Sequence, residues 1–141
     1  GVRRAVLDAV ARRYPLGSVY LRDPADSVSA IRARGVAVGK ALVIAGLAAG
    51  LRPAAARRGI PLNHGFSGVS PFDPTRDFAA DLPRFLKRPG RAHLVMCHPG
   101  FIDDELRALD PVIGSRPVEH AALLAFVPPP GLRLARFREL G

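Results

Sequence analysis

An apolar run over residues 92–97 stops abruptly at His98-Pro99-Gly100, and this stop limits the possible folds more than any other feature of the chain. The run is apolar on both faces, which is typical of a parallel strand covered by helices. Pro99 biases His98 toward an extended backbone, and Gly100 relieves crowding beside it. We therefore expect a strand that ends at Cys97 and carries an imidazole just past its carboxyl end.

Helical periodicity and short β-rich runs alternate along the rest of the chain, which predicts parallel β/α units. In the first helix, Val2, Val6, Leu7 and Val10 form the expected apolar face. Pro83 falls inside a later helical pattern and predicts a kink or a shortened helix. We predict helices over residues 2–13, 36–51 (broken near 50–53), 54–58, 75–88 and from 115 or 116 to 126, and strands over 18–21, 92–97 and 132–137.

The segment 59–74, GIPLNHGFSGVSPFDP, is rich in Gly, Pro, Ser and Asn. Its composition predicts a loop, and a loop of this length in a compact domain indicates function. Thr75 is the expected N-cap of the helix that follows. The apolar face of that helix is expected to contain Phe78, Leu82, Phe85 and Leu86.

Composition excludes several classes of protein. The chain has 141 residues, 48% of them apolar, which predicts one globular domain. The net charge of +9 comes almost wholly from scattered arginines with no aromatic platform for bases between them, so we expect no nucleic-acid partner. Cys97 is the only cysteine, which favours a reducing, cytoplasmic setting. The longest uncharged run, residues 41–51, is too short to span a membrane.

Two side chains that follow predicted strands are candidates for chemistry, each with a structural alternative. His98 is either a general acid or base at the strand end or a ring that caps a loop carbonyl. Arg22 either clamps an anionic or polyhydroxy ligand or forms an ion pair with Asp23 or Asp26.

Two further candidates lie in the segment 59–74. Asn63 either recognises a substrate hydroxyl with its amide or serves the geometry of a turn. Phe66 either packs against the face of a sugar or belongs to the hydrophobic core.

Two nearby features look reactive but are predicted to be structural. Asp103, Asp104 and Glu105 suggest a metal site, but consecutive carboxylates at a helix start point in different directions, and the first turn of a helix favours acids. Cys97 precedes His98, and adjacent strand residues face opposite sides of a sheet, so we expect no Cys-His dyad. We therefore assign no metal ligand within the chain.

Three stretches, YLRDPADS, NHGFSGVSPFDP and LVMCHPGFIDDEL, together resemble the YdjC-like carbohydrate deacetylase family over nearly the whole chain. The MCHPG element, with its trailing apolar residue and aspartate, is the most specific of them. The resemblance implies an α/β fold, namely the C-terminal portion of a distorted (β/α) barrel with parallel strands and covering helices. It also implies the removal of an acetyl group from an N-acetylated sugar or glycolipid.

The resemblance further implies a divalent cation, Mg²⁺ or Zn²⁺, that polarises the amide and activates water. Its aspartate and histidine ligands belong to the family's N-terminal half and are absent from this chain. His98 matches the family's histidine in MCHPG, which implies a general acid or a contact to the acetyl group or its oxyanion. Arg22, Asn63 and Phe66 are the implied substrate contacts.

Residues 1–141 are therefore expected to form a single partial domain, the C-terminal half of such a barrel. Gly1 in place of Met predicts that the natural chain begins upstream. We expect the isolated chain to hydrolyse little or nothing, to expose sheet edges and apolar surface, and to associate with itself as a homo-oligomer. The alternative function is a non-catalytic remnant that binds an anionic ligand or serves in assembly.

Overall fold

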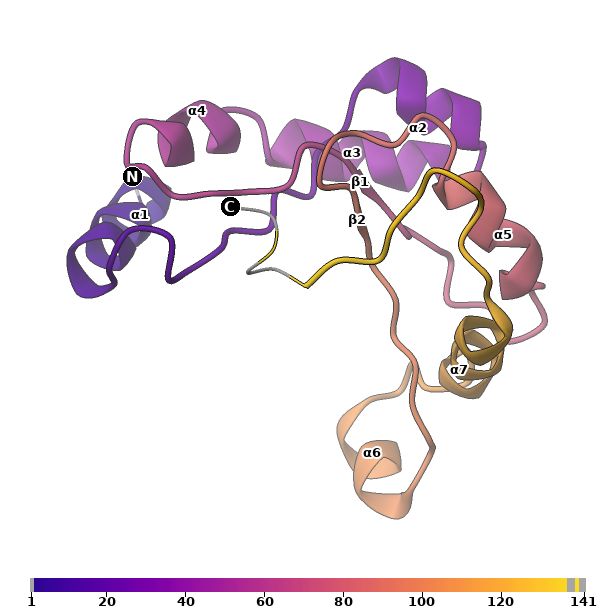
Figure 1. Ribbon diagram of the computed structural model, residues 1–141. Coiled ribbons are helices and arrows are strands. Elements are labelled where there is room, and N and C mark those ends of the chain that lie inside the picture. The colour runs from indigo at the N-terminus through magenta and orange to yellow at the C-terminus, as the bar shows by residue number, and fades with distance from the viewer. Residues whose placement is uncertain (1, 137–138, 140–141) are drawn as a thin grey trace.

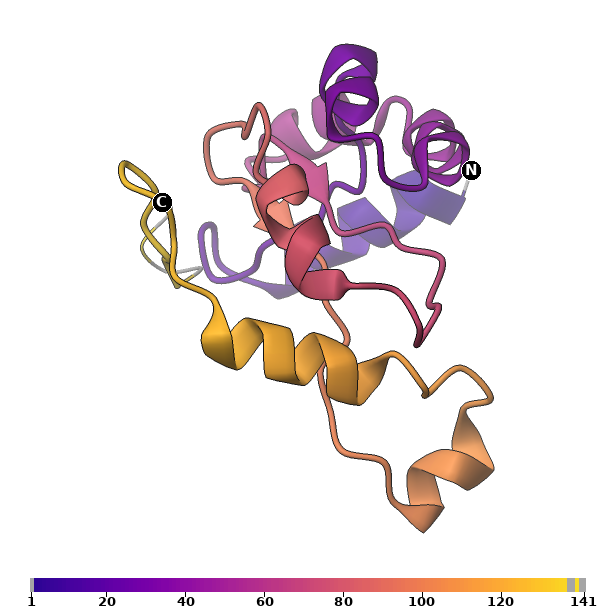
Figure 2. The ribbon, with the colours of Figure 1, turned by 90° about the vertical axis from the view of Figure 1, so that its right-hand side faces the viewer.

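A computed structural model describes residues 2–136 and 139 of the chain. Helices and short strands alternate along it, and one helix, α6, projects away from the main body (Figures 1 and 2). The elements in chain order are α1 (Val2–Arg13), α2 (Val28–Arg34), α3 (Val38–Leu47), α4 (Leu51–Ala56), β1 (Phe66–Ser67), α5 (Phe78–Phe85), β2 (Leu94–Val95), α6 (Asp104–Leu109) and α7 (Arg116–Ala125).

Three extended segments run in parallel at the centre of the body. β1 pairs with β2 so that Phe66 lies opposite Leu94, and Leu21 forms a single parallel bridge with Leu62, shortly before β1. The predicted parallel direction is confirmed, but the paired strands are much shorter than the predicted runs at 18–21 and 92–97. The closed barrel implied by the resemblance stays a prediction.

Gly68 allows the chain that follows β1 to approach the end of β2 very closely. Its φ is +91°, a backbone conformation that residues with a side chain rarely adopt. A Cβ atom at this position would lie only 2.0 Å from the carbonyl oxygen of Met96. The carboxyl ends of the two strands are held together by a contact that only glycine permits.

Two separate hydrophobic clusters lie on either side of the parallel segments (Figure 1). The first joins α1 and α4 through buried residues Leu7, Ala54, Ala55 and Ile60. The second joins α5, α7 and β2 through buried residues Val36, Phe78, Leu82 and Phe85, with Val95 and Cys97 packed against them. Burial of Phe78, Leu82 and Phe85 confirms these residues of the predicted apolar face, whereas Leu86 is half-buried and lies just past the end of α5.

The buried guanidinium of Arg34 connects elements that are far apart in the sequence. This side chain is only 4% exposed and forms an ion pair of 2.8 Å with the Oδ2 atom of Asp26. It also donates to the carbonyl oxygens of Phe66 (2.8 Å), Lys87 (3.0 Å) and Arg88 (3.1 Å). The end of α2, strand β1 and the turn after α5 therefore share one charged group.

Several helices form where the sequence predicts them. The predicted bounds of α1 are confirmed, and those of α7 are confirmed to within a residue at each end. Pro83 lies inside α5, which is shorter than predicted, as a proline in the pattern indicates. The N-cap of α5 is Asp77, whose carboxylate accepts the N–H of Ala80, and not Thr75.

Other predictions are wrong. The segment 59–74 is not entirely a loop, because it contains β1. Helix α2 was not predicted, although Ser27 caps it by accepting the N–H of Ala30. On α1 only Leu7 is buried, while Val2 and Val6 are exposed. Residues 132–136 form no strand, and position 137 of that predicted strand lies outside the described residues.

Within the described residues, Val38–Ala56 is the one helical stretch long and apolar enough to cross a membrane by length and composition. It consists of α3 and α4, which Gly50 separates in a left-handed conformation with φ of +81°. Arg52, in α4, forms an ion pair with the buried Asp23 of the body. The prediction that the chain has no membrane span stays a prediction.

The chain exposes more surface than its size requires. Its accessible area is 8920 Å², whereas a compact chain of 15.0 kDa exposes about 7,000 Å². Part of this excess comes from α6, of which no residue is buried, and from Phe101 and Leu109 beside and within it, which are 78% and 75% exposed. Exposed apolar surface of this kind is what the prediction of self-association requires.

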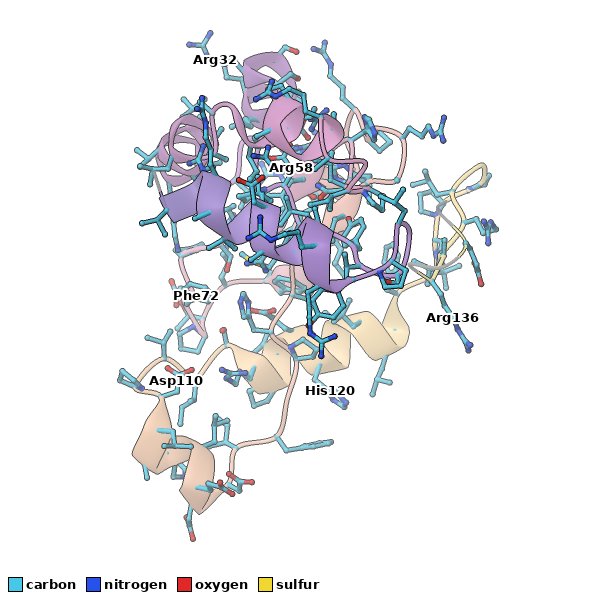
Figure 3. All side chains as sticks on the ribbon, turned by 90° about the vertical axis from the view of Figure 1, so that its left-hand side faces the viewer. Arg32, Arg58, Phe72, Asp110, His120 and Arg136 are labelled. Carbon is cyan, nitrogen blue, oxygen red and sulfur yellow. The ribbon has the colours of Figure 1, made fainter. Side chains whose placement is uncertain are left out.

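We predict that Arg34→Ala lowers the free energy of unfolding by about 3–5 kcal/mol, because it leaves the Asp26 carboxylate, only 12% exposed, without its cation. Urea denaturation followed by circular dichroism measures the effect. Arg32→Ala is the matched control, since Arg32 is an exposed arginine of the same helix (Figure 3); its loss changes stability by less than about 0.5 kcal/mol. Equal effects of the two substitutions would contradict the structural role of Arg34.

We also predict that the isolated chain associates with itself in a concentration-dependent manner. The physical reason is the apolar surface that the chain leaves uncovered. Sedimentation velocity across a range of protein concentrations tests this, with an average mass that rises above that of the 15.0 kDa monomer as the expected result. A monomer at every concentration would show the prediction to be wrong.

Candidate functional site

The carboxyl ends of β1 and β2 lie side by side, and an arginine that follows the first parallel segment reaches them with its side chain. Arg22 directly follows the Leu21 bridge, and His98 lies shortly after β2. The Nη1 atom of Arg22 lies 3.8 Å from the sulfur of Met96, which links the ends of the outer two segments. In parallel β/α folds this end of the sheet is where reactive groups collect. We call this region the strand-end site; its residues are Arg22, Lys40, Phe72, Met96, His98 and Glu119.

His98 is held against helix α7 by the turn that follows β2. Its backbone N–H donates to the Oε2 atom of Glu119 at 2.6 Å, and the N–H of Gly100 donates to the carbonyl oxygen of Arg116 at 3.4 Å. The imidazole is 32% exposed, with its Nδ1 atom 3.9 Å from the same Oε2. Within the described residues the ring donates to no loop carbonyl, so the ring-capping interpretation finds no support.

Phe72 and Lys40 extend the site next to His98. The rings of Phe72 and His98 meet edge to face with centroids 5.0 Å apart. The ammonium of Lys40 lies 4.4 Å from the centre of the Phe72 ring and donates to the carbonyl of Ser70 at 3.0 Å. Phe72 has a φ of +58°, which is strained for a bulky residue and is typical of functional sites. The sequence predicts neither residue, because the prolines of SPFDP restrict Ser70 and Asp73, which precede them, and not Phe72.

The projecting α6 arm is attached to the body next to this site. Arg116 forms an ion pair of 2.8 Å with Asp110, and this hydrogen bond lowers the pKa of the Asp110 carboxyl. Figure 3 shows Phe72 and Asp110 near the place where the arm joins the body. At the other end of the arm, the ring of Phe101 lies 4.7 Å from that of His120. One end of the arm is therefore bound to Arg116, the first residue of α7, and the other end contacts His120 within α7.

Arg22 is exposed and forms an ion pair with neither Asp23 nor Asp26. Asp23 pairs with Arg52 at 2.9 Å, and Asp26 pairs with the buried Arg34 at 2.8 Å. The pairing alternative is therefore wrong. Within the described residues, the sulfur of Met96 is the hydrogen-bond acceptor closest to the Arg22 guanidinium, so a role in ligand binding stays a prediction.

Asn63 is fully buried and joins two of the parallel segments. Its Oδ1 atom accepts the N–H of Asp23, and its Nδ2 atom donates to the carbonyls of Asp23 and Gly65, all at 2.8 Å. These bonds replace backbone pairing between the first two segments. The predicted contact between Asn63 and substrate gains no support from this placement.

Phe66 is also buried, with 4% of its surface exposed. Its backbone N–H donates to Asp26, and its carbonyl accepts from Arg34. The core-packing interpretation of Phe66 is confirmed, and a contact to a sugar face gains no support.

Cys97 directly precedes His98 and is half-buried. It packs against the cluster formed by α5 and α7. Burial, together with the charge of Glu119, raises the pKa of its thiol to about 11. A thiol with so high a pKa is a poor nucleophile near neutral pH, in agreement with the assignment of Cys97 as structural.

The acidic residues after the turn do not form a metal site. Asp103 caps α6 by accepting the N–H of Leu106 at 2.8 Å, and Asp104 and Glu105 are exposed in its first turn. Among the described residues, no group of three His, Cys, Asp or Glu side chains is placed to hold a metal ion. The residues present do not fit the cation that the family resemblance implies.

Comparisons with protein-family models, with curated proteins and with solved structures find no match to this chain. The YdjC-like resemblance therefore stays a prediction. The functional argument rests on the geometry of the strand-end site.

We predict that Cys97 of the folded protein reacts with iodoacetamide at pH 8 about a hundredfold more slowly than in urea. The thiolate is the reactive form, and a pKa of about 11 makes it scarce at pH 8, whereas an unfolded thiol has a pKa of about 8.5. The folded rate rises as the pH approaches about 11, and the same shift makes folding less favourable over that range. Mass spectrometry measures both rates; equal rates would contradict the burial of the thiol.

Proposed function

We propose that this chain is part of a metal-dependent hydrolase that removes the acetyl group from an N-acetylated sugar or glycolipid. The observation that carries the proposal is the position of His98. Its imidazole lies past the carboxyl end of a parallel strand, is partly exposed, and has one nitrogen directed toward a buried carboxylate. Within the described residues the other nitrogen, Nε2, has no hydrogen-bond partner, so it is free to meet a substrate.

Amide hydrolysis needs a proton donor beside the nitrogen that departs. The oxygen of a water molecule bonds to the acetyl carbon, the carbon–nitrogen bond breaks, and acetate leaves. The sugar nitrogen departs as an amine and takes up a proton, which the Nε2 atom of protonated His98 supplies. The proton of the attacking water goes to a base that this proposal places outside the chain.

The exposed side chains around His98 suit a carbohydrate. The Phe72 ring gives an apolar surface for the C–H face of a sugar, as aromatic rings commonly do, although Lys40 lies against the ring. The Arg22 guanidinium has donors for sugar hydroxyls. The cation and its ligands belong in this proposal to a part of the polypeptide beyond these residues, because the side chains present do not fit a metal.

A second function, binding of an anionic ligand without catalysis, is favoured by one specific observation. Arg22 and Lys40 bring two cations to the strand-end site, and no carboxylate in the described residues pairs with either. Calorimetric titration with acetate and with inorganic phosphate separates the two functions. Phosphate binding in full-length protein that has no deacetylase activity would favour the second.

We predict that His98→Ala lowers the turnover of an N-acetylated chitooligosaccharide by about 10²–10⁴-fold in the full-length protein with saturating metal. The loss is expected in kcat, because the departing amine lacks its proton donor. Release of acetate measures the rate. The printed chain alone is expected to show no turnover.

His64→Ala is the matched control for this experiment. His64 is an exposed histidine that lies between the Leu62 bridge and β1 and is not one of the residues of the strand-end site. Its replacement should leave kcat within about twofold of the wild-type value. Unchanged turnover of His98→Ala would rule out the general-acid role, and a full-length protein inactive on every acetylated sugar would refute the proposed function.

A further inference from the structure

Glu119 is a buried carboxylate whose hydrogen bonding is incomplete. It is 1% exposed and lies in α7, among the apolar residues that face β2. Its Oε2 atom accepts the backbone N–H of His98, but its Oε1 atom is buried and has no hydrogen-bond partner in the described part of the chain. Burying a charged oxygen without a partner is costly, and such groups persist where they serve a function.

The same oxygen that holds the backbone of His98 also faces its ring. The Nδ1 atom lies 3.9 Å from Oε2, which is too long for a hydrogen bond but within ion-pair distance. Catalytic hydrogen bonds are often long before substrate binds and shorten afterwards. A small rotation of the imidazole is enough to bring Nδ1–H onto the carboxylate, since the backbone bond already fixes the position of the residue.

The other charged groups around His98 are occupied by partners of their own. Asp110 is bound by Arg116, and Lys40 lies against Phe72 and the carbonyl of Ser70. Within the described residues, Glu119 has no arginine or lysine partner. Within the described residues, His98 is the one cation-forming side chain at ion-pair distance from this buried carboxylate.

We propose that Glu119 is a positioning residue for His98: its carboxylate holds the ring so that Nδ1 carries a proton and Nε2 faces the substrate. The catalytic part of this inference rests on the proposed deacetylase function. A carboxylate on one nitrogen of a histidine fixes the tautomer and the orientation of the ring and stabilises its protonated form. In the reaction, Nε2 gives its proton to the departing amine while Nδ1 keeps its own.

The first test reads the ring directly and needs no activity. Nitrogen-15 NMR of the printed chain identifies which nitrogen of His98 bears the proton at alkaline pH, where the ring is neutral. We expect the Nδ1–H tautomer in the wild-type chain. A ring that instead carries its proton on Nε2 overturns the proposal without any substitution.

The second test uses Glu119→Gln, which keeps the size of the side chain and an acceptor for the His98 N–H but removes the charge. We expect the ratio of the Nδ1–H to the Nε2–H tautomer of the neutral His98 ring to fall about tenfold, because the ring loses its charged acceptor. Glu105→Gln, an exposed carboxamide substitution on α6, is the matched control and should leave the ring unchanged. An unaltered tautomer ratio of His98 in a folded Glu119→Gln chain overturns the proposal.

The third test measures turnover in the full-length protein. We expect Glu119→Gln to lower kcat about tenfold to a hundredfold with KM little changed, a smaller loss than that of His98→Ala. A wild-type protein without deacetylase activity refutes the proposed function while the NMR result still decides whether Glu119 orients His98. Full activity of Glu119→Gln alongside an inactive His98→Ala overturns the positioning role and leaves the proposed function standing.

Discussion

The buried guanidinium of Arg34 is the interaction on which the rest of the structure depends. Its planar group has five N–H donors, so one side chain satisfies carbonyls from two distant segments and still pairs with Asp26. Strands as short as β1 and β2 cannot hold a sheet together by backbone pairing alone. Arg34 supplies the missing connection, because it fixes β1 both to α2, which carries Arg34, and to the turn between α5 and β2.

A second set of buried polar contacts, made by the amide of Asn63, connects the segment that contains Arg22 to the one before β1. Asn63 joins the first two parallel segments through its amide, and Asp23, which it contacts, is itself held by Arg52. The ends of the segments are therefore fixed by buried side-chain bonds. The Arg22 guanidinium also reaches the sulfur of Met96, two residues before His98, although Arg22 and Met96 are far apart in the sequence.

The sequence was most informative where the signal is local. Helices α1 and α7 follow from apolar periodicity, the shortened α5 from Pro83, and the place of His98 from the proline and glycine that follow it. The features that the sequence did not reveal depend on contacts between residues that are far apart along the chain. Asp23 and Asp26 follow Arg22 within four residues yet pair with other arginines. The burial of Glu119 and the strand at Phe66 likewise depend on distant neighbours, so neither shows in local composition.

The turn at Pro99 also determines how far another strand could extend along the open edge of β2. The N–H groups of Leu94 and Met96 donate to the chain around β1, so Val95, Cys97 and residue 99 are the positions that would donate outward. Proline has no N–H, and those of its two neighbours, His98 and Gly100, are taken by α7. Pairing at this edge therefore has to stop at Cys97. The residues that shape the site thus also limit how far a strand from another molecule could pair along this edge.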